Sequence, residues 1–314
     1  MIGPCFQDIV KASERIRSFI HKTPVLYSSS INGILDSKIY FKCENFQKAG
    51  AFKFRGASHA VSTLNEILKK KGVATHSSGN HAAALALAAT MHNIPSYIVM
   101  PENAPRIKKL AVAGYGAKIF YCSSTLEARE QTLKQVVNKT GAIFIHPYDN
   151  EKVIAGQGTS ALELLDQTPA LDIVIAPVGG GGLLSGTAIT VKHMSPTTKI
   201  FGAEPAGADD AARSFYSGKL IPSLRPQTIA DGLLTSLSER TFAIIRQNVD
   251  NIMIVREETI IQAMRMIWER MKIIVEPSAA VPFAAVIEHN DLFRHKTIGI
   301  ILSGGNVDLD HLPF

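Results

Sequence analysis

Residues 42–57, KCENFQKAGAFKFRGA, join a strand to a helix through a short polar turn. The apolar segment IYFKCENF predicts the strand, and a helical pattern begins directly after Lys53. A lysine becomes a useful nucleophile at neutral pH when apolar neighbours desolvate it or another cation lies nearby. Phe52 and Phe54 offer the first condition, and Arg55 offers the second. The alternative is a solvated lysine at the start of a helix.

Outward from this segment, short β-branched runs alternate with amphipathic helical runs along almost the whole chain. Strands that alternate with helices of about 10–15 residues indicate βαβ units and mainly parallel sheets. The expected fold class is therefore α/β. The expected strands are 73–77, 96–100, 117–122, 142–145, 172–178, 199–204 and 297–303.

The composition is that of an ordinary globular chain. It has 314 residues, 46% of them apolar and 19% charged, which suffices for one large domain or two moderate ones. We expect no signal peptide and no membrane contact, because no apolar run approaches the roughly 20 residues of a membrane span. The widely spaced Cys5, Cys43 and Cys122 argue against disulfides and against a cysteine zinc site, and they favour a cytoplasmic location.

The formal charge of +6 permits an anionic ligand. The basic run Lys69-Lys70-Lys71 precedes Gly72 and is typical of a helix C-terminus, where cations complement the helix dipole. Because no basic stripe or nucleic-acid motif accompanies it, we expect no nucleic-acid partner.

A run of four glycines, Gly179, Gly180, Gly181 and Gly182, lies between a predicted strand and a predicted helix. Glycines there let backbone N–H groups converge on an anion at a helix N-terminus, which suits a phosphate. The run lacks the Lys of a Walker loop and does not complete G-x-G-x-x-G. A purely structural turn stays open, as does a dinucleotide site with Glu204 as the ribose-binding acid.

The segment THSSGNH at 75–81 is again a strand end, a loop and a helix start. Its hydroxyl and N–H groups suit a carboxylate, which the helix dipole also favours. Ser and Asn are equally common as helix N-caps, so capping alone also explains the segment.

The segments ENFQKAGAFKFRGA, SSGNH, PVGGGG and SGGN together resemble those of the serine racemase and serine/threonine dehydratase family of fold-type II enzymes, which use pyridoxal 5'-phosphate (PLP). The resemblance spans about residues 5–310. It implies two open, mainly parallel α/β domains, the small one inserted in the large one. Residues 1–71 and 146–314 would form the large PLP-binding domain, and residues 72–145 the small domain.

The resemblance also implies cofactor contacts. Lys53 takes the place of the family's Schiff-base lysine, Phe52 packs on the cofactor ring, and the four glycines hold its phosphate. Asn80 contacts the phenolic oxygen and Ser303 the pyridine nitrogen. Glu276 lies near the ring in the family, although an acid before Pro277 is equally typical of a helix start.

The resemblance implies that the segment SSGNH binds the substrate, through Ser77, Ser78, Asn80 and His81. Ser78 would stand across the substrate from Lys53, and inversion at Cα requires one proton-transfer group on each face. Biosynthetic threonine dehydratases generally carry a small residue without a hydroxyl at this place, so Ser78 favours racemisation. A neutral hydroxyl at Ser303 leaves the ring a weaker electron sink, and elimination is then expected beside racemisation.

The segment FGAEPAGADD at 201–210 offers carboxylates and a turn carbonyl, which are ligands for Mg²⁺, Mn²⁺ or Ca²⁺. From the residues alone, acids in a first helical turn are the alternative. The resemblance makes Glu204, the carbonyl of Ala208 and Asp210 a structural site for a divalent cation.

Animal members of the family bind an activating nucleotide, ATP, between two subunits, so the resemblance implies a homodimer. Ala83 replaces a Gln and Ala49 replaces a hydroxyl residue of those members, and both departures count against nucleotide activation here. The residues that fall near the nucleotide are Ser29, Ser30, Ile31, Lys48, Tyr115, Lys272 and Asn306.

The expected function is PLP-dependent racemisation of L-serine to D-serine, with β-elimination of serine or threonine to a 2-oxo acid and ammonia. The first alternative is a dehydratase of serine, threonine or 3-hydroxyaspartate without significant racemisation. An alternative of another class is a non-catalytic regulator that binds PLP or a nucleotide.

Overall fold

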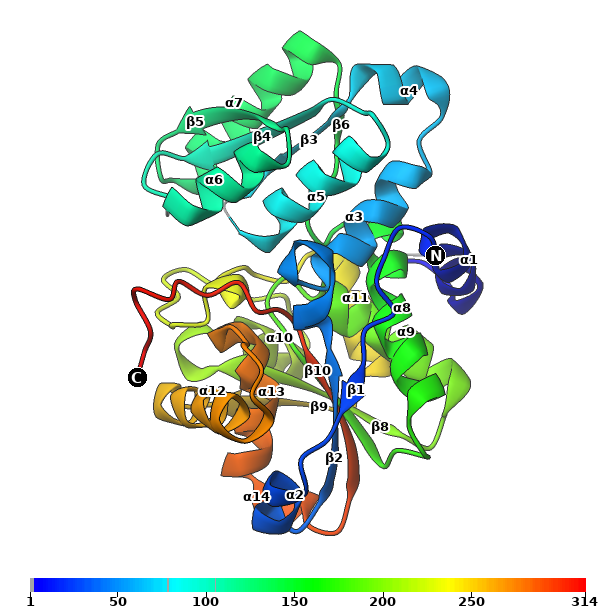
Figure 1. The fold of residues 1–314 in the computed structure, drawn as a ribbon, viewed down its shortest axis with the longest axis vertical. Coiled ribbons are helices and arrows are strands. Elements are labelled where there is room, and N and C mark those ends of the chain that lie inside the picture. The colour runs from blue at the N-terminus through cyan, green and yellow to red at the C-terminus, as the bar shows by residue number, and fades with distance from the viewer. Residues whose placement is uncertain (1–2, 78, 105) are drawn as a thin grey trace.

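The computed structural model describes residues 3–77, 79–104 and 106–314 and arranges their strands in two sheets (Figure 1). The larger sheet has the order β1-β2-β10-β7-β8-β9, and the smaller has the order β5-β4-β3-β6. All neighbours are parallel except β1 and β2, which confirms the α/β class with mainly parallel sheets. The strands are β1 (Val25–Leu26), β2 (Lys38–Cys43), β3 (Val73–His76), β4 (Ser96–Pro101), β5 (Lys118–Cys122), β6 (Ile143–Phe144), β7 (Ile173–Pro177), β8 (Lys199–Pro205), β9 (Asn251–Val255) and β10 (Thr297–Leu302).

Helices cover the sheets and connect their strands. The α-helices are α1 (Phe6–Ile16), α2 (Ser29–Leu35), α3 (Lys53–Ser62), α4 (Glu66–Lys71), α5 (Asn80–Met91), α6 (Arg106–Gly114), α7 (Leu126–Thr140), α8 (Glu151–Gln167), α9 (Gly182–Met194), α10 (Asp210–Ser217), α11 (Glu239–Asn248), α12 (Glu257–Met271), α13 (Pro277–Glu288) and α14 (Asn290–Phe293). Short 3₁₀ turns are η1 (Glu44–Phe46), η2 (Lys48–Gly50), η3 (Ala206–Ala208) and η4 (Asp231–Leu233). Among the residues described, none of the helices combines the length and apolarity that a bilayer crossing requires.

The two sheets come from different parts of the chain. Every strand of the smaller sheet lies between residues 73 and 144, whereas the larger sheet uses strands from both flanks. Figure 1 shows the smaller sheet above the larger one, with α3 between them. The assignment of 1–71 and 146–314 to one domain and 72–145 to another stays a prediction.

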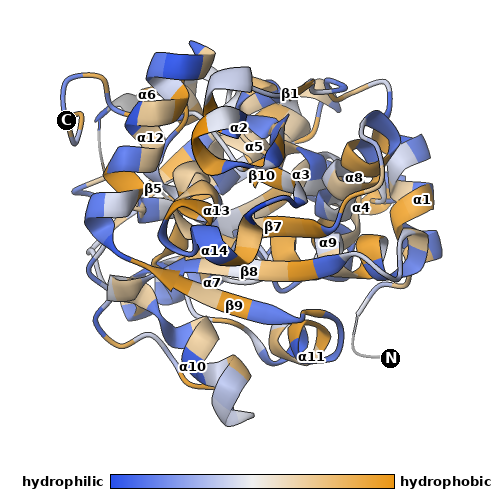
Figure 2. Cartoon of the chain, turned by 90° about the horizontal axis from the view of Figure 1, so that it is seen from below, coloured by the Kyte–Doolittle hydropathy of each residue, from blue (hydrophilic) through white to orange (hydrophobic). Residues whose placement is uncertain are grey.

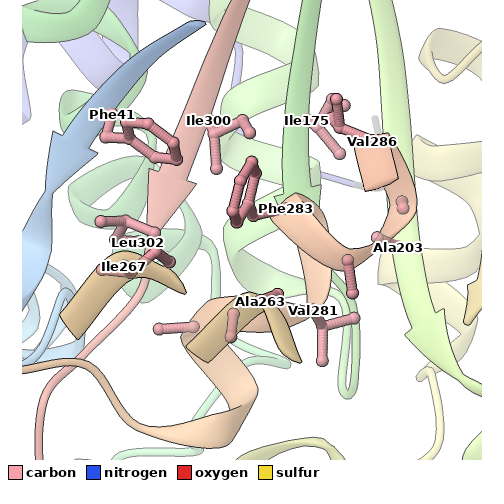
Figure 3. Packing of buried hydrophobic residues seen from close by; sticks show 14 of the residues in the cluster. Phe41, Ile175, Ala203, Ala263, Ile267, Val281, Phe283, Val286, Ile300 and Leu302 are labelled. Carbon is pink, nitrogen blue, oxygen red and sulfur yellow. The ribbon is translucent and has the colours of Figure 1, made fainter. Parts of the chain in front are cut away.

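The larger sheet is buried on both faces, because helices cover each side. Successive strand residues point to opposite faces and so pack in different clusters. Ile300 and Leu302 of β10 pack in a cluster with α12 and α13, where Phe283 lies against Phe41 at a ring-centroid distance of 5.4 Å (Figure 3). Ile301, between them in sequence, packs on the opposite face in the cluster that includes α8 and α9. In Figure 2, hydrophobic residues mark α13 and the middle of β8 and β9.

The smaller sheet follows the same alternation. Ile98 and Met100 of β4 pack with α5, while Val99 packs with α7 on the other face. The expected helix end at Gly72 is confirmed, since this residue follows α4 with a positive φ of 85°. Gly141 ends α7 in the same way, in a left-handed conformation with φ 71°.

Helix α8 lies close to both α3 and α9 because glycines line the two contacts. A methyl group at Gly156 would lie 2.6 Å from the carbonyl oxygen of Arg55 on α3. A methyl group at Gly186 of α9 would lie 2.6 Å from the nitrogen of Gly158 and 2.6 Å from the oxygen of Ile154. The three helices therefore touch backbone to backbone, and α8 fixes how α3 and α9 lie relative to each other.

We expect Gly186→Ala to lower the free energy of unfolding by about 2–3 kcal/mol, because the backbones of α8 and α9 must separate to admit the methyl group. Gly33→Ala in α2 is the matched control, since a methyl group there meets nothing within 4 Å. The control should raise stability by about 0.5–1 kcal/mol through helix propensity. Urea unfolding of both variants checks this, and equal stabilities would contradict the close helix contact.

Candidate active site

The side chain of Lys53 is half-buried at the start of α3. Its Nζ donates a hydrogen bond to the carbonyl oxygen of Pro147 at 3.0 Å and lies 5.1 Å from the centroid of the Phe52 ring. Burial lowers the pKa of this amine to about 8, and the charge of Glu276 acts in the opposite direction. The amine therefore loses its proton far more readily than an exposed lysine does.

The sequence-based role of Arg55 as a nearby cation that activates Lys53 is wrong. Its guanidinium is fully buried and donates to Glu44 and Glu163, so its charge is neutralised where it lies. Phe54 also points elsewhere, into the core around α5. Desolvation, with Phe52 as the aromatic contact, is the cause of the lowered pKa of Lys53.

The glycine run forms the turn between β7 and α9. Gly181 has φ 81°, a left-handed conformation that glycine adopts without strain. Among the described residues, the N–H groups of Gly179, Gly180 and Gly181 have no backbone or side-chain acceptor. Unpaired N–H groups at the positive end of a 13-residue helix fit a phosphate.

The loop between β6 and α8, which contains Pro147 and Tyr148, joins Lys53 to these glycines. Pro147 accepts the hydrogen bond from Lys53, and a methyl group at Gly180 would lie 2.2 Å from Cδ1 of the neighbouring Tyr148. A methyl group at Gly182 would lie 2.6 Å from Oε1 of Gln157. The run of four glycines was the available signal, because the space left by absent side chains must be filled by larger ones from another segment.

The other wall of the site is built around Ser303, which is buried at the end of β10. Its carbonyl oxygen accepts the N–H of Phe52 at 3.0 Å. The N–H of Glu276 donates to Gly304 at 3.0 Å, and Nδ2 of Asn80 donates to the Glu276 carboxylate at 2.8 and 3.0 Å. The structure thus brings the segments around Lys53, Asn80, Glu276 and Ser303 together.

Burial and, less strongly, the charge of Asp231 raise the pKa of Glu276 to about 7, against the hydrogen bond from Asn80, which lowers it. Asp231 itself forms an ion pair with Lys108. This pair joins η4 to α6. Glu276 is the N-cap residue of α13, so the helix-start interpretation is also correct for its backbone.

The segment at 75–81 lies between β3 and α5. Oγ of Ser77 accepts the N–H of Gly79 at 3.3 Å. His81 is buried, contacts the carbonyl oxygen of Ile145 through Nε2 at 3.1 Å, and has a pKa of about 3 because of burial and the charge of Lys53. It is therefore neutral at physiological pH. Ser78, the expected second proton-transfer residue, lies outside the described residues.

Two of the expected metal ligands lie near each other beside α10. The Glu204 carboxylate accepts the N–H groups of Ala211 at 3.1 Å and Ala212 at 2.9 Å. Both carboxyl oxygens of Asp210 are buried, and they have no hydrogen-bond partner in the described part of the chain. Ala208 is buried in η3, just before this helix. No group of three or more His, Cys, Asp or Glu side chains suited to a metal occurs among the described residues.

A cavity of about 310 Å³ opens beside Asn80. Two of the expected nucleotide contacts, Tyr115 and Asn306, line this cavity. Ala49 and Ala83, the two residues that differ from those of the animal members, line it as well. The remaining expected contacts are not among the described residues that line the cavity, namely Ser29, Ser30, Ile31, Lys48 and Lys272.

The α/β fold, a lysine of lowered pKa and a glycine-rich loop that suits a phosphate are together compatible with an enzyme that uses an anionic cofactor. The model of the family described as "pyridoxal-phosphate dependent enzyme" matches residues 16–304. The chain belongs to this family of PLP-dependent enzymes, whose fold-type II members share its two-sheet architecture.

Individual relatives match over nearly the full length. The chain is 51% identical to the serine racemase of Dictyostelium discoideum, over 98% of this chain and 96% of that protein. It is 50% identical to the L-threo-3-hydroxyaspartate ammonia-lyase of Saccharomyces cerevisiae, over 98% and 95%. The crystal structure of the Dictyostelium serine racemase superimposes with a TM-score of 0.94 at 51% identity, covering 98% of this chain and 100% of that one.

In the cofactor-free protein, we expect acylation of Lys53 to rise with a midpoint near its pKa of about 8. Glu276→Gln should move this midpoint to lower pH, because the carboxylate charge raises the pKa of the amine. Mass spectrometry of the Lys53 peptide across a pH series measures both midpoints. The matched control Glu269→Gln alters an exposed carboxylate and should change nothing. A wild-type midpoint near 10.5, the ordinary value for lysine, would contradict a buried amine.

Proposed function

We propose that this protein racemises L-serine to D-serine and, in the same site, eliminates the β-hydroxyl of serine or threonine to give a 2-oxo acid and ammonia. The observation that carries the proposal is the placement of a buried, readily deprotonated amine beside a glycine loop suited to phosphate. The similarity to a serine racemase over nearly the whole chain supports the choice of substrate.

The cofactor supplies an electron sink that stabilises negative charge at the substrate Cα. Lys53 would carry it, Phe52 would pack on its ring, and Gly179 to Gly182 would bind its phosphate. Asn80, Glu276 and Ser303 would surround the ring, an arrangement supported by the hydrogen bonds that join their segments.

Lys53 would remove the Cα proton on one face of the substrate, a role that its lowered pKa suits. Ser78 would return a proton on the other face and so complete the inversion. Ser77, Asn80 and His81 would bind the substrate carboxylate at the start of α5, where the helix dipole favours an anion. Loss of the β-hydroxyl instead of reprotonation leads to the 2-oxo acid and ammonia.

The alternative is a dehydratase that acts on 3-hydroxyaspartate, serine or threonine with little racemisation. The 50% identity to a 3-hydroxyaspartate ammonia-lyase favours it as the second candidate. Both candidates use the same amine and the same phosphate site, so they differ in the fate of the Cα carbanion and in the group that the β-carbon carries. Membership of an enzyme family disfavours a non-catalytic regulator.

The larger assembly is also part of the proposal. We propose a cytoplasmic homodimer, in which 72–145 form the small domain and 1–71 with 146–314 the large one. Three free cysteines are compatible with a reducing compartment. Mg²⁺, Mn²⁺ or Ca²⁺ would bind Glu204, Ala208 and Asp210. ATP would be a weak activator or none, because the two alanines in the cavity beside Asn80 remove hydrogen-bond partners.

Ser78→Ala should reduce D-serine formation from L-serine at least about 100-fold, because one face loses its proton donor, while pyruvate formation falls less than about tenfold. Chiral chromatography of the products, with pyruvate measured alongside, tests this and the proposed function together. Ser124→Ala, at an exposed loop serine, is the control. Equal loss of both activities would contradict the two-face assignment, and wild-type protein that makes pyruvate but no D-serine would favour the dehydratase.

Mg²⁺ should raise the midpoint of thermal unfolding by about 2–4 °C, because it binds the folded state only. Asp210→Asn should abolish this increase, since it removes a carboxylate whose oxygens are buried and unpaired in the described structure. Asp209→Asn is the matched control, because Asp209 instead pairs with Arg213 at 2.7 Å. Differential scanning calorimetry with and without EDTA measures the shifts. A response that survives in Asp210→Asn would rule out this site.

A further inference from the structure

A cluster of four buried charges lies behind the candidate active site. It consists of Lys42, Glu44, Arg55 and Glu163, and is called the charge cluster below. The first three side chains are fully buried, and Glu163 is 14% exposed. Two cations face two carboxylates, so the cluster as a whole is neutral.

Every donor of the two cations is used. The guanidinium of Arg55 bonds both oxygens of Glu44 at 2.7 and 2.8 Å and both oxygens of Glu163 at 2.8 Å. Lys42 Nζ donates to Glu163 at 2.7 Å, to Gln167 at 2.9 Å and to a backbone carbonyl at 2.7 Å. Such a bidentate contact fixes the relative orientation of the two side chains as well as their distance, because the planar guanidinium and the carboxylate must lie in one plane.

The charge cluster joins α3 to α8. Arg55 stands two residues after Lys53 on α3, and Glu163 stands on α8. In its middle, α8 touches α9 at Gly158 and reaches the glycine loop through Gln157. Contacts between glycine backbones allow two helices to approach but also to slide. The paired hydrogen bonds of Arg55 with Glu163 prevent sliding, since any shift along the axis would break them.

Stability alone does not account for the charge cluster. Buried ion pairs recover little more than the cost of removing their charges from water, and apolar side chains of similar volume often stabilise a protein as well or better. What charged, hydrogen-bonded groups add is a defined relative position.

We infer that the charge cluster fixes the spacing between the amine of Lys53 and the loop Gly179–Gly182, and that it thereby makes the site select the phosphorylated form of its cofactor. This inference rests on the roles of Lys53 and the loop in the proposed function. Arg55 is then a positioning residue. A ligand that engages the amine and the loop together depends on their spacing, whereas a ligand that engages the amine alone does not.

Dissociation constants of PLP and of pyridoxal, which lacks the phosphate, separate these two cases. Cofactor-free wild type, Arg55→Lys and the control Arg265→Lys are titrated at a temperature at which circular dichroism shows each to be folded. Arg265 forms an ion pair with Glu269 at 2.7 Å in which both side chains are exposed. Its replacement therefore alters an arginine–glutamate pair that is not buried. Arg55→Lys keeps the charge but loses the paired geometry.

We expect Arg55→Lys to weaken PLP binding about tenfold or more and pyridoxal binding less than about threefold, so that the preference for PLP falls. Arg265→Lys should match the wild type. Equal weakening of both ligands, or no change in either, would overturn the inference. Glu163→Gln provides the same comparison should Arg55→Lys fail to fold. Wild-type protein that binds PLP but forms no D-serine would overturn the proposed function while leaving this inference intact.

Discussion

The burial of one amine is the constraint on which the arrangement of this protein depends. Lys53 has a single hydrogen-bond partner among the described residues, the carbonyl of Pro147, and an aromatic ring beside it. An ammonium ion in such surroundings is costly, so the pKa falls to about 8 and the neutral amine forms at lower pH than in an exposed lysine. Excluding water from one lysine requires walls from several parts of the chain, and the two sheets provide them.

Those walls follow from the parallel sheets. In each sheet the carboxyl ends of the parallel strands lie on one edge. The loops after β7 and β10 of the larger sheet and after β3 of the smaller sheet bring the glycine loop, Ser303 and Asn80 toward the start of α3. Hydrogen bonds then tie the loops to one another, as between Asn80 and Glu276. The edges of the two sheets and the start of α13 thus bring together a glycine loop that suits a phosphate, a carboxylate of raised pKa and the amine of Lys53.

Helix α8 determines how the segments that form the site are positioned relative to one another. Glycines let it touch α3 on one side and α9 on the other, and the charge cluster holds α3 in register. The polar interior around Arg55 thus has a different purpose from the apolar cores on either face of the larger sheet. The cores hold the layers together, whereas the charge cluster determines where two particular helices stand.

The amino-acid sequence by itself determined the α/β class, the alternation of strands and helices, the helix end at Gly72 and the glycine turn after β7, because these depend on local periodicity and backbone freedom. Sequence could not place Arg55, whose identity allows either a cation beside Lys53 or a buried ion pair. Sequence also could not show that Pro147 contacts Lys53 or that Tyr148 fills the space beside Gly180, because these partners lie far apart along the chain. Only the tertiary structure decided these, because desolvation, hydrogen bonding and the filling of space left by glycines depend on which segments meet.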